Sequence, residues 1–477
     1  MEIDYKSLGF KAGLEIHQQL AGKKLFCHCS TLNSDQKQDV TFERALRAVA
    51  GEQGDIDIAA RHEMEKSKRY RYVGDSQDTC LIEYDETPPE PMNHDALETG
   101  IIVALLLNAS IVDEIQVMRK TVVDGSNVSG FQRTALIARN GFVETSLGKV
   151  AIPTICLEEE ACQKLDDTEG ILTYKLDRLG IPLLEIATDA SLNNPEHAKE
   201  TASIIGMVLR SLPGIKRGLG TIRQDVNVSI SQGARTEIKG FQDLRSIPKI
   251  IDFEIQRQLD EIKKGRKAHK EVRKAEPDFT TSFLRPLPGA ARLYPETDVL
   301  PVTVNKKQID DKRKNLPKLL TERISDIEKK YHLHAELARE LVEHEHFDKL
   351  VTKFAHIEPA IIAHTLIEVP KEIKARFKLD PTILSYHDFE ETLSYLEKKK
   401  ISKETIIDIL IKKIRKEKIN LEEYKAVSEE DLEVAIKVLI AQKPDLSAGA
   451  YMGLLMEKYR GKVDGKKIME MVRKYVK

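Results

Sequence analysis

The hydrophobic pattern of this 477-residue chain changes in character near residue 305, and this change constrains its fold more than any other feature. Before that point, short alternating runs such as residues 9–20 and 149–160 are separated by Gly and Pro, which is typical of β-strands. After it, Gly becomes scarce and apolar residues recur at helical spacing. The sequence therefore predicts an α+β region over residues 1–305 and an all-α region over 306–477.

The helical region is itself expected to divide. A chain this long exceeds the size at which a single core stops growing, so several domains are expected. From residue 391 to the end, Lys and Arg outnumber Asp and Glu by five. We therefore predict a helical domain at 306–390 and a modestly basic tail domain at 391–477, which is either an RNA-facing surface or a solvated helical face.

Composition excludes several classes of protein. Lys and Arg number 75 and Asp and Glu number 77, so the molecule as a whole lacks the basic charge of a general nucleic-acid binder. No apolar run is long enough for a membrane span, and the N-terminus lacks the apolar core of a signal peptide. Five cysteines are too few for a disulfide scaffold. A soluble, cytoplasmic protein is expected.

Standard nucleotide-binding and hydrolase motifs are absent. The sequence has neither a P-loop nor a Gly-rich dinucleotide turn between strand and helix, and it lacks the zinc-protease and serine-hydrolase signatures. Any chemistry must therefore come from the charged residues that lie inside its β-like runs.

Three such runs have the ligands of a divalent cation. Glu15 and His17 are two residues apart, so on a strand they point to the same face. Glu158 follows an apolar run, and Glu185 lies within one, where an unpaired charge would cost several kcal/mol. Carboxylates and an imidazole together can hold a metal ion. The alternatives are a solvent-facing strand and a structural ion pair.

Two further runs alternate charge. Arg223 and Asp225 share one face of the first, and Glu237 and Lys239 share one face of the second. If the two strands pair, they form a polar floor with cations suited to phosphate oxygens. A ladder of surface salt bridges is the alternative. The Pro- and Gly-punctuated stretch 285–298, which includes Arg285 and Arg292, is typical of a binding loop.

Three cysteines offer a second kind of metal site. Cys27, Cys29 and Cys80 have thiols that could bind zinc, but a closed structural site needs four ligands. His28 and His94 are candidates for the fourth. Zinc is thus a possible cofactor, and unliganded cysteines are the alternative.

The ordered series of motifs resembles one family. In order along the chain the motifs are LGFKAGLEIHQQL, LFCHCS, TCLIEYDETPPEPMN, LEEEAC, DRLGIPLLEIATD, GLGTIRQDVNVSI, RTEIKGFQDL and RPLPGAARLYPETD. Together they resemble the GatB/GatE family of tRNA-dependent amidotransferase subunits, and their wording is closer to its archaeal branch. The resemblance runs from about residue 8 to the end of the chain.

This resemblance implies a fold and a function. The fold is a cradle-shaped catalytic domain related to glutamine synthetase, followed by a helical domain and a YqeY-like tail that embraces tRNA. The implied enzyme is a ligase that uses ATP and Mg²⁺ to phosphorylate the γ-carboxylate of Glu-tRNA(Gln). Ammonia from an asparaginase-like partner, GatD, then gives Gln-tRNA(Gln). The implied assembly is a heterotetramer of two GatD subunits and two copies of this chain.

The resemblance also assigns roles to residues. The family's magnesium ligands fall by motif on His17, Glu158 and Glu185. Glu15 and Asp225 are neighbours expected to help bind the nucleotide and metal. Phosphate and acyl-phosphate contacts are expected from three cations, which are Arg223, Lys239 and Arg292.

One departure and two alternatives accompany these expectations. Archaeal members carry an insert similar to a domain of bacterial aspartyl-tRNA synthetases before the RPLPGAAR motif. Only residues 265–284 separate the preceding helix from that motif in this chain, so the insert is expected to be missing. The alternatives are a bacterial-type subunit that also acts on Asp-tRNA(Asn), and a non-catalytic tRNA-binding or assembly factor.

Overall fold

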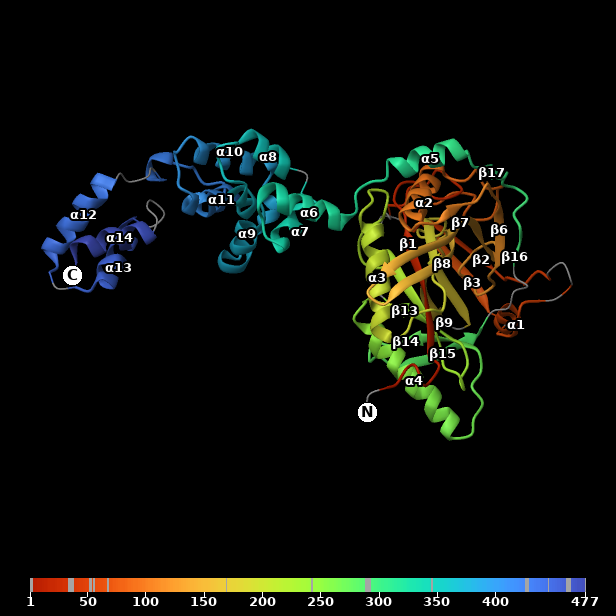
Figure 1. Cartoon of the computed structure of the whole chain (residues 1–477). Helices are drawn as coiled ribbons and strands as arrows, with labels where there is room; N and C mark the ends of the chain where they lie inside the picture. Colours follow the sequence, from red (N-terminus) through yellow and green to blue (C-terminus); the bar gives the residue numbers. More distant parts are fainter. Residues whose placement is uncertain are drawn as a thin grey trace. The chain divides into compact units, whose positions relative to one another are not determined.

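The computed structural model describes residues 3–32, 38–50, 54, 56–66, 68–168, 170–241, 243–287, 293–344, 346–424, 429–444, 446–459 and 465–476. Contacts divide the chain into two compact units, Met1–Leu319 and Leu320–Lys477. In the described residues the first unit mixes helices with strands and the second is helical. The predicted α+β architecture is therefore confirmed (Figure 1).

The first unit is built on one large sheet. Its strands are β1 Lys11–Gln19, β4 Ser110–Ile111, β6 Val117–Thr121, β7 Phe131–Thr145, β8 Gly148–Glu159, β11 Pro182–Ala187, β12 Ile222–Ser229, β13 Thr236–Phe241, β14 Glu271–Ala275, β15 Thr281–Pro286 and β16 Leu293–Pro295. In the described residues the order is β15-β14-β13-β12-β1-β11-β8-β7-β6-β16, with β4 paired to β7. All neighbours are antiparallel except β13 and β14.

Side chains alternate between the two faces of this sheet, as the period of two in its strands requires. Leu14 and Ile16 of β1 join the apolar core, whereas Glu15 and His17 face the other way. Three helices cover the core face: α2 His94–Leu106, α3 Pro195–Arg210 and α4 Ser246–Lys263. Helices α3 and α4 pack side by side (Figure 1). Each buried Leu or Ile contributes roughly 1.5–3 kcal/mol, so the core fixes which face carries the charged residues.

Chain connectivity requires the sheet to curve. Ten strands lying flat would place β15 and β16 roughly 43 Å apart at their usual spacing. Yet β15 ends at Pro286 and β16 begins at Leu293, so a short connection can span no more than about 25 Å. The two edges therefore approach each other around the polar face, and residues from both edges line one cavity.

Smaller elements complete the first unit. They are β2 Val40–Arg44, α1 Ile58–Glu65, β3 Arg69–Gly74, β5 Glu114–Ile115, β9 Gln163–Thr168, β10 Ile171–Lys175, β17 Val302–Thr303 and α5 Lys306–Lys314. The order β2-β3-β10-β9 makes a four-stranded sheet, and β17 pairs with β5. Buried tyrosines of β3 and β10 form a separate core cluster for the four-stranded sheet.

The apolar stretch 96–111 is helical only in its first part, as helix α2. Asn93 caps α2 by accepting hydrogen bonds from Asp95 N and Ala96 N. The helix ends at Leu106, and Asn108 then adopts a positive φ of 58°. An Asn tolerates this left-handed conformation. The chain can therefore turn back into β4, Ser110–Ile111.

Helix α5 lies in the first unit, although residues 306–390 were predicted as one helical domain. Lys312 of α5 pairs with Glu98 of α2, and Ile309, Leu316 and Leu319 pack on the main core. The first unit therefore extends to Leu319 rather than ending at residue 305. Hydrophobic spacing alone does not reveal that a helix packs back onto the preceding sheet.

The described elements of the second unit are all helices. The α-helices are α6 Leu320–Tyr331, α7 Ala335–Leu341, α8 Phe347–Lys353, α9 Pro359–Phe377, α10 Tyr386–Glu397, α11 Ile406–Ile414, α12 Glu429–Gln442, α13 Ala448–Tyr459 and α14 Gly465–Tyr475, and the short 3-10 helices are η1 Pro381–Ile383, η2 Lys403–Thr405 and η3 Leu421–Tyr424. Two clusters that share Ile361, Phe389 and Leu396 occupy residues 327–424. The last three helices have a cluster of their own.

These clusters bear on the predicted division after residue 390, which falls inside α10. Apolar side chains on both sides of that residue, Phe389 and Leu396, share the same clusters. The packing places a more natural boundary between Tyr424 and Glu429. None of the helices in the described part of the chain is long and apolar enough to cross a membrane.

Candidate active site

The register of three central strands brings the predicted residues together. His17 of β1 lies opposite Glu185 of β11 on one side and Arg223 of β12 on the other. Glu15 lies opposite Asp225. Because paired residues of adjacent strands point to the same face, residues distant in the sequence form one polar surface.

This surface lines a cavity of about 660 Å³. Charged and polar side chains make up most of the wall, which draws on β1, β6, β7, β8, β11, β12, β13, β15 and β16. Its residues are Glu15, His17, Lys120, Val122, Asp124, Ser126, Asn127, Gln132, Glu158, Glu160, Ala161, Leu183, Glu185, Arg223, Asp225, Arg235, Glu237, Lys239, Gly240, Arg285, Leu287 and Leu293. A ligand held here would be recognised by charge and hydrogen bonds rather than by apolar contact.

His17, Glu158 and Glu185 form a group that could hold a metal ion. One donor atom of each lies within 4.8 Å of the others, and His17 Nε2 is 3.5 Å from Glu185 Oε2. Gln132 Nε2 donates to Glu158 Oε2 at 3.1 Å, which fixes that carboxylate. Two carboxylates and an imidazole suit a divalent cation, so the predicted ligands fit the ion expected for them.

The electrostatics of this group are those of two buried carboxylates that share one lysine, Lys120. Burial, and next the charge of Glu185, raises the pKa of Glu158. Burial would also raise the pKa of Glu185, but Lys120 and then His17 hold it below its usual range. Burial would lower the pKa of His17, yet its contact with Glu185 raises it. The two buried carboxylates therefore compete for protons and for Lys120, as they would for a metal ion.

A second acidic group lies beside the first. Glu15, Asp225 and Glu237 each place a carboxylate oxygen within 4.8 Å of the others. Lys239 Nζ lies 2.6 Å from Asp225 Oδ2 and 2.6 Å from Glu237 Oε1. Burial, and next the charge of Glu185, raises the pKa of Glu15 to about 7. Strands β12 and β13 do pair, which is the condition for the polar floor, and the pairing joins Lys239 to the acids.

The predicted cations are fixed in place by acids. Arg223 donates from Nη1 and Nη2 to the two oxygens of Glu160, at 2.8 Å each. This bidentate pair orients the guanidinium, with Gln19 as a further donor to Glu160 at 2.9 Å. Arg223 and Lys239 thus both lie in the cavity wall. Arg292, the third predicted cation, lies outside the described residues.

Sequence reasoning missed several wall residues. Lys120 of β6 forms ion pairs with Glu158 at 2.6 Å and Glu185 at 3.7 Å. Arg235, immediately before β13, donates to Asn227 Oδ1 at 2.9 Å. The alternation of β6 and the Asp-Gly-Ser-Asn turn that follows it were readable signals, but only the folded sheet brings Lys120 of β6 within reach of Glu158 of β8 and Glu185 of β11.

The segment 285–298 was predicted as one binding loop. In the structure Arg285 lines the cavity, but Glu296 does not. Glu296 is instead fully buried and pairs with Arg119 at 2.6 Å and Arg133 at 2.8 Å. Truncating one partner of such a buried pair is strongly destabilising. Glu296 is therefore a structural residue that ties β16 to β6 and β7.

The three predicted cysteine ligands meet a fourth donor that the sequence reasoning missed. Cys27, Cys29 and Cys80 place their sulfurs within 4.8 Å of one another and of a Glu83 carboxylate oxygen. His28 and His94, the proposed fourth ligands, pair with Glu90 at 2.9 Å and Glu98 at 3.8 Å instead. Three thiols and one carboxylate make the four donors of a closed zinc site.

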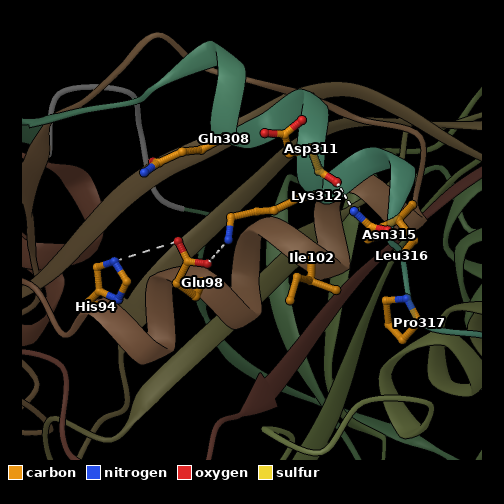
Figure 2. A pocket seen from close by; sticks show the side chains of 9 residues that line it. All are labelled: His94, Glu98, Ile102, Gln308, Asp311, Lys312, Asn315, Leu316 and Pro317. Atoms are coloured by element: carbon orange, nitrogen blue, oxygen red, sulfur yellow. Dashed lines mark hydrogen bonds and ion pairs between the residues drawn. The ribbon is translucent and has the colours of Figure 1, made fainter.

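A separate hollow of about 460 Å³ lies between α2 and α5. Figure 2 shows Glu98 between His94 and Lys312, and Glu98 forms an ion pair with each of them. Ile102, Leu316 and Pro317 supply apolar lining. Its central charges are paired with each other, so this hollow fastens α5 to α2 and does not resemble a reaction site.

Comparisons with known proteins agree with this geometry. A family model described as the GatB/GatE catalytic domain matches residues 10–310. The E-type subunit of glutamyl-tRNA(Gln) amidotransferase from Methanocaldococcus jannaschii is 35% identical to this chain, with 100% of both chains covered. Proteins of the same name from Archaeoglobus fulgidus and Methanococcus maripaludis are 35% and 34% identical, covering 100% of this chain and 99% of each relative.

The relatives are longer than this chain. The alignment with the M. jannaschii protein has 629 positions against 477 residues here, so at least 152 positions carry no residue of this chain. Because the alignment covers the whole of both sequences, these positions are internal. That number is large enough for a domain, as expected for a missing insert.

Proposed function

This chain belongs to the GatB/GatE family, and from that premise we propose that it phosphorylates the γ-carboxylate of Glu-tRNA(Gln) with ATP and then amidates it to give Gln-tRNA(Gln). It is the activating subunit of an amidotransferase, a carbon-nitrogen ligase. We propose that the large sheet forms a glutamine-synthetase-like cradle and that the last helices form a YqeY-like tail for tRNA.

One observation carries this proposal. A cation-binding trio, His17, Glu158 and Glu185, shares a single polar cavity with oriented Arg and Lys side chains. Phosphoryl transfer requires little covalent chemistry from the protein and depends on positioning and on neutralising a spread negative charge. Mg²⁺ held by this trio would polarise phosphoryl oxygens. The cavity is thus suited to joining a nucleotide phosphate to a carboxylate.

The protein's own cations have separable tasks. Arg223 and Lys239 are held rigidly by Glu160, Asp225 and Glu237, so they supply a preorganised positive surface for phosphate oxygens. Arg235 and Arg285 also line the cavity, and within the described residues neither has an ion pair with an acid. A guanidinium of this kind can turn to bind phosphate in a bidentate manner.

Ammonia must come from elsewhere, because the sequence has no recognisable amidase nucleophile. We propose that a glutaminase subunit of the GatD type supplies it, in an assembly of two such subunits with two copies of this chain. In this proposal the acylphosphate stays in the cavity until ammonia attacks its carbonyl carbon and phosphate leaves.

The test is ATP hydrolysis by the purified chain with GatD and Mg²⁺, with and without Glu-tRNA(Gln), while Gln-tRNA(Gln) is measured in parallel. ATP turnover that requires the charged tRNA, matched by amide formation, supports the proposal. Tight tRNA binding without turnover would overturn it in favour of a tRNA-binding factor. Equal turnover of Asp-tRNA(Asn) would instead favour the bacterial-type specificity.

A further inference from the structure

Hydrogen bonds from the neighbouring four-stranded sheet hold one turn in the cavity wall. The turn comprises residues 123–127, directly after β6. Three tyrosine hydroxyls donate to its consecutive carbonyls: Tyr70 to Val123, Tyr174 to Asp124 and Tyr72 to Gly125, at 2.9, 2.8 and 2.8 Å. Cys162 N donates to Ser126 O at 2.8 Å. Every carbonyl from 123 to 126 is thus fixed by a buried donor.

Tyr70 and Gly125 pack closely enough to hold the turn in one conformation. Burial, and next the charge of Asp124, raises the pKa of Tyr70 to about 12, so its hydroxyl stays a donor. Gly125 has φ +87°, and a Cβ there would lie 2.2 Å from the Tyr70 ring. Only glycine allows this approach. Such fixed backbone is what holds a binding group in place before its ligand arrives.

The turn presents an acceptor that has no donor. Asn127 is 2% exposed, and its Oδ1 has no hydrogen-bond partner within the described residues. Its side chain lines the main cavity. A buried amide oxygen left unpaired costs roughly 1–3 kcal/mol. The cost is offset if a ligand with an N–H group occupies the cavity.

Asp124 adds a negative charge beside that acceptor. Its Oδ1 accepts from Ser126 N and Ser126 Oγ, at 3.0 and 2.6 Å. Most other acids of the cavity are matched by Arg or Lys, as Glu160 is by Arg223. Asp124 lines the same cavity and has no ion pair in the part of the chain that the structure describes. Its charge therefore awaits a cation from outside the chain.

The geometry points to an ammonium-binding subsite at this turn, with Asp124 supplying the counter-charge and Asn127 Oδ1 accepting an N–H. It is distinct from the metal trio, whose side chains lie on β1, β8 and β11. The inference rests on the proposed function, in which two amines enter the cavity. One is the α-ammonium group of the esterified glutamate, and the other is ammonium itself.

Substrate pairs distinguish the two sources. Glu-tRNA(Gln) and N-acetyl-Glu-tRNA(Gln) differ only in the charge and hydrogen bonds of the α-amine, and filter binding measures their affinities without any turnover. If the turn binds the α-ammonium, acetylation weakens binding to the wild type by about tenfold, the size of one charged hydrogen bond. In Asp124→Asn the penalty for acetylation disappears. The Asn side chain keeps the acceptor for Ser126, so the turn is preserved.

The second arm uses ammonium chloride as the nitrogen source with the whole chain and GatD. If the turn binds ammonium, Asp124→Asn raises the KM for ammonium chloride about tenfold and leaves the acetylation penalty unchanged. Asp166→Asn, an exposed change on β9, is the matched control. An Asp124→Asn protein that changes neither quantity overturns the inference. If the wild-type protein with GatD forms no Gln-tRNA(Gln) from ammonium chloride, that result counts against the proposed function instead.

Asn127 gives an independent check. Asn127→Leu removes the acceptor at similar volume, and Asn127→Asp retains it. We expect Asn127→Leu to change the same readout as Asp124→Asn, which is either the acetylation penalty on tRNA binding or the KM for ammonium chloride. Its melting temperature should stay that of the wild type. A void of about 20 Å³ also borders Asn127 and has room for a single water. If that water is the true partner, Asn127→Leu lowers the melting temperature and leaves amine recognition intact, which contradicts the inference.

Discussion

Lys120 Nζ lies 2.6 Å from Glu158 Oε1, inside the group of donors suited to a divalent cation. The same ammonium is 3.7 Å from Glu185 Oε2. The Lys120 ammonium therefore neutralises the same two carboxylates that a metal ion would bind. Binding of the ion must move Lys120 or weaken both ion pairs.

Removing this ammonium should tighten metal binding. In Lys120→Met the two carboxylates lose their competing cation, so the affinity for Mn²⁺ should rise roughly tenfold. Electron paramagnetic resonance of free Mn²⁺ measures this directly. Lys149→Met, an exposed lysine over the Phe142 ring, should leave the affinity unchanged. Weaker binding in Lys120→Met would show that Lys120 supports the metal ligands rather than competing with the ion.

Glu185→Gln should separate activation from tRNA binding. The substitution keeps the shape of the side chain but removes one carboxylate from the trio, so ATP-dependent activation should fall by roughly 100-fold or more. The affinity for tRNA should stay within about twofold, because surface contacts to the phosphate backbone supply most of it. Glu144→Gln, at an exposed position of β7, is the control. Wild-type turnover in Glu185→Gln would contradict the metal assignment.

Metal affinity should increase with pH. The pKa values of two ligands, His17 and Glu158, are raised, and the pKa of the neighbouring Glu15 is raised to about 7, so protons compete with a metal ion at this site. A metal ion must displace these protons, so its affinity falls as pH drops through the raised values. Calorimetry in buffers of different ionisation enthalpy measures the released protons. Metal affinity that is the same on both sides of pH 7 would contradict this prediction.

The cysteine group should carry zinc. Its four donors, Cys27, Cys29, Cys80 and Glu83, match a closed structural site, so purified protein should contain stoichiometric zinc by elemental mass spectrometry. Cys80→Ser should lose the metal and lower the melting temperature. Cys156→Ser, outside the group, should retain zinc. Zinc-free protein of unchanged stability after dialysis against a chelator would contradict the assignment.

The last three helices should contribute to tRNA affinity. Because they have their own core cluster, a chain ending at Tyr424 should fold, whereas a cut after residue 390 would split α10. Loss of this segment should weaken tRNA binding, and the slope of affinity against salt should become less steep. Filter binding over a range of salt concentrations provides the measurement. Equal affinity at every salt concentration would show that the tail does not touch tRNA.

The sequence by itself determined which residues could meet in the site. A period of two places Glu15 with His17 on one face of a strand, and the apolar residues between them force the opposite face into the core. The same period identified Arg223, Asp225 and Lys239, whereas Glu158 and Glu185 were identified by their position after and within apolar runs. All five line one cavity. The change to helical spacing likewise identified the second half of the chain as helical.

Only the tertiary structure decided which side chains pair. Nothing in the local sequence singles out Lys120 or Glu83. The folded sheet brings Lys120 to Glu158, and loop packing brings Glu83 to the three cysteines. Helix α5 has ordinary helical spacing, yet its ion pair with Glu98 fixes it to the first unit. The turn at Asn127 gained its role from tyrosines of another sheet. Local spacing fixes the direction of a side chain, whereas its partners depend on contacts between segments far apart in the chain.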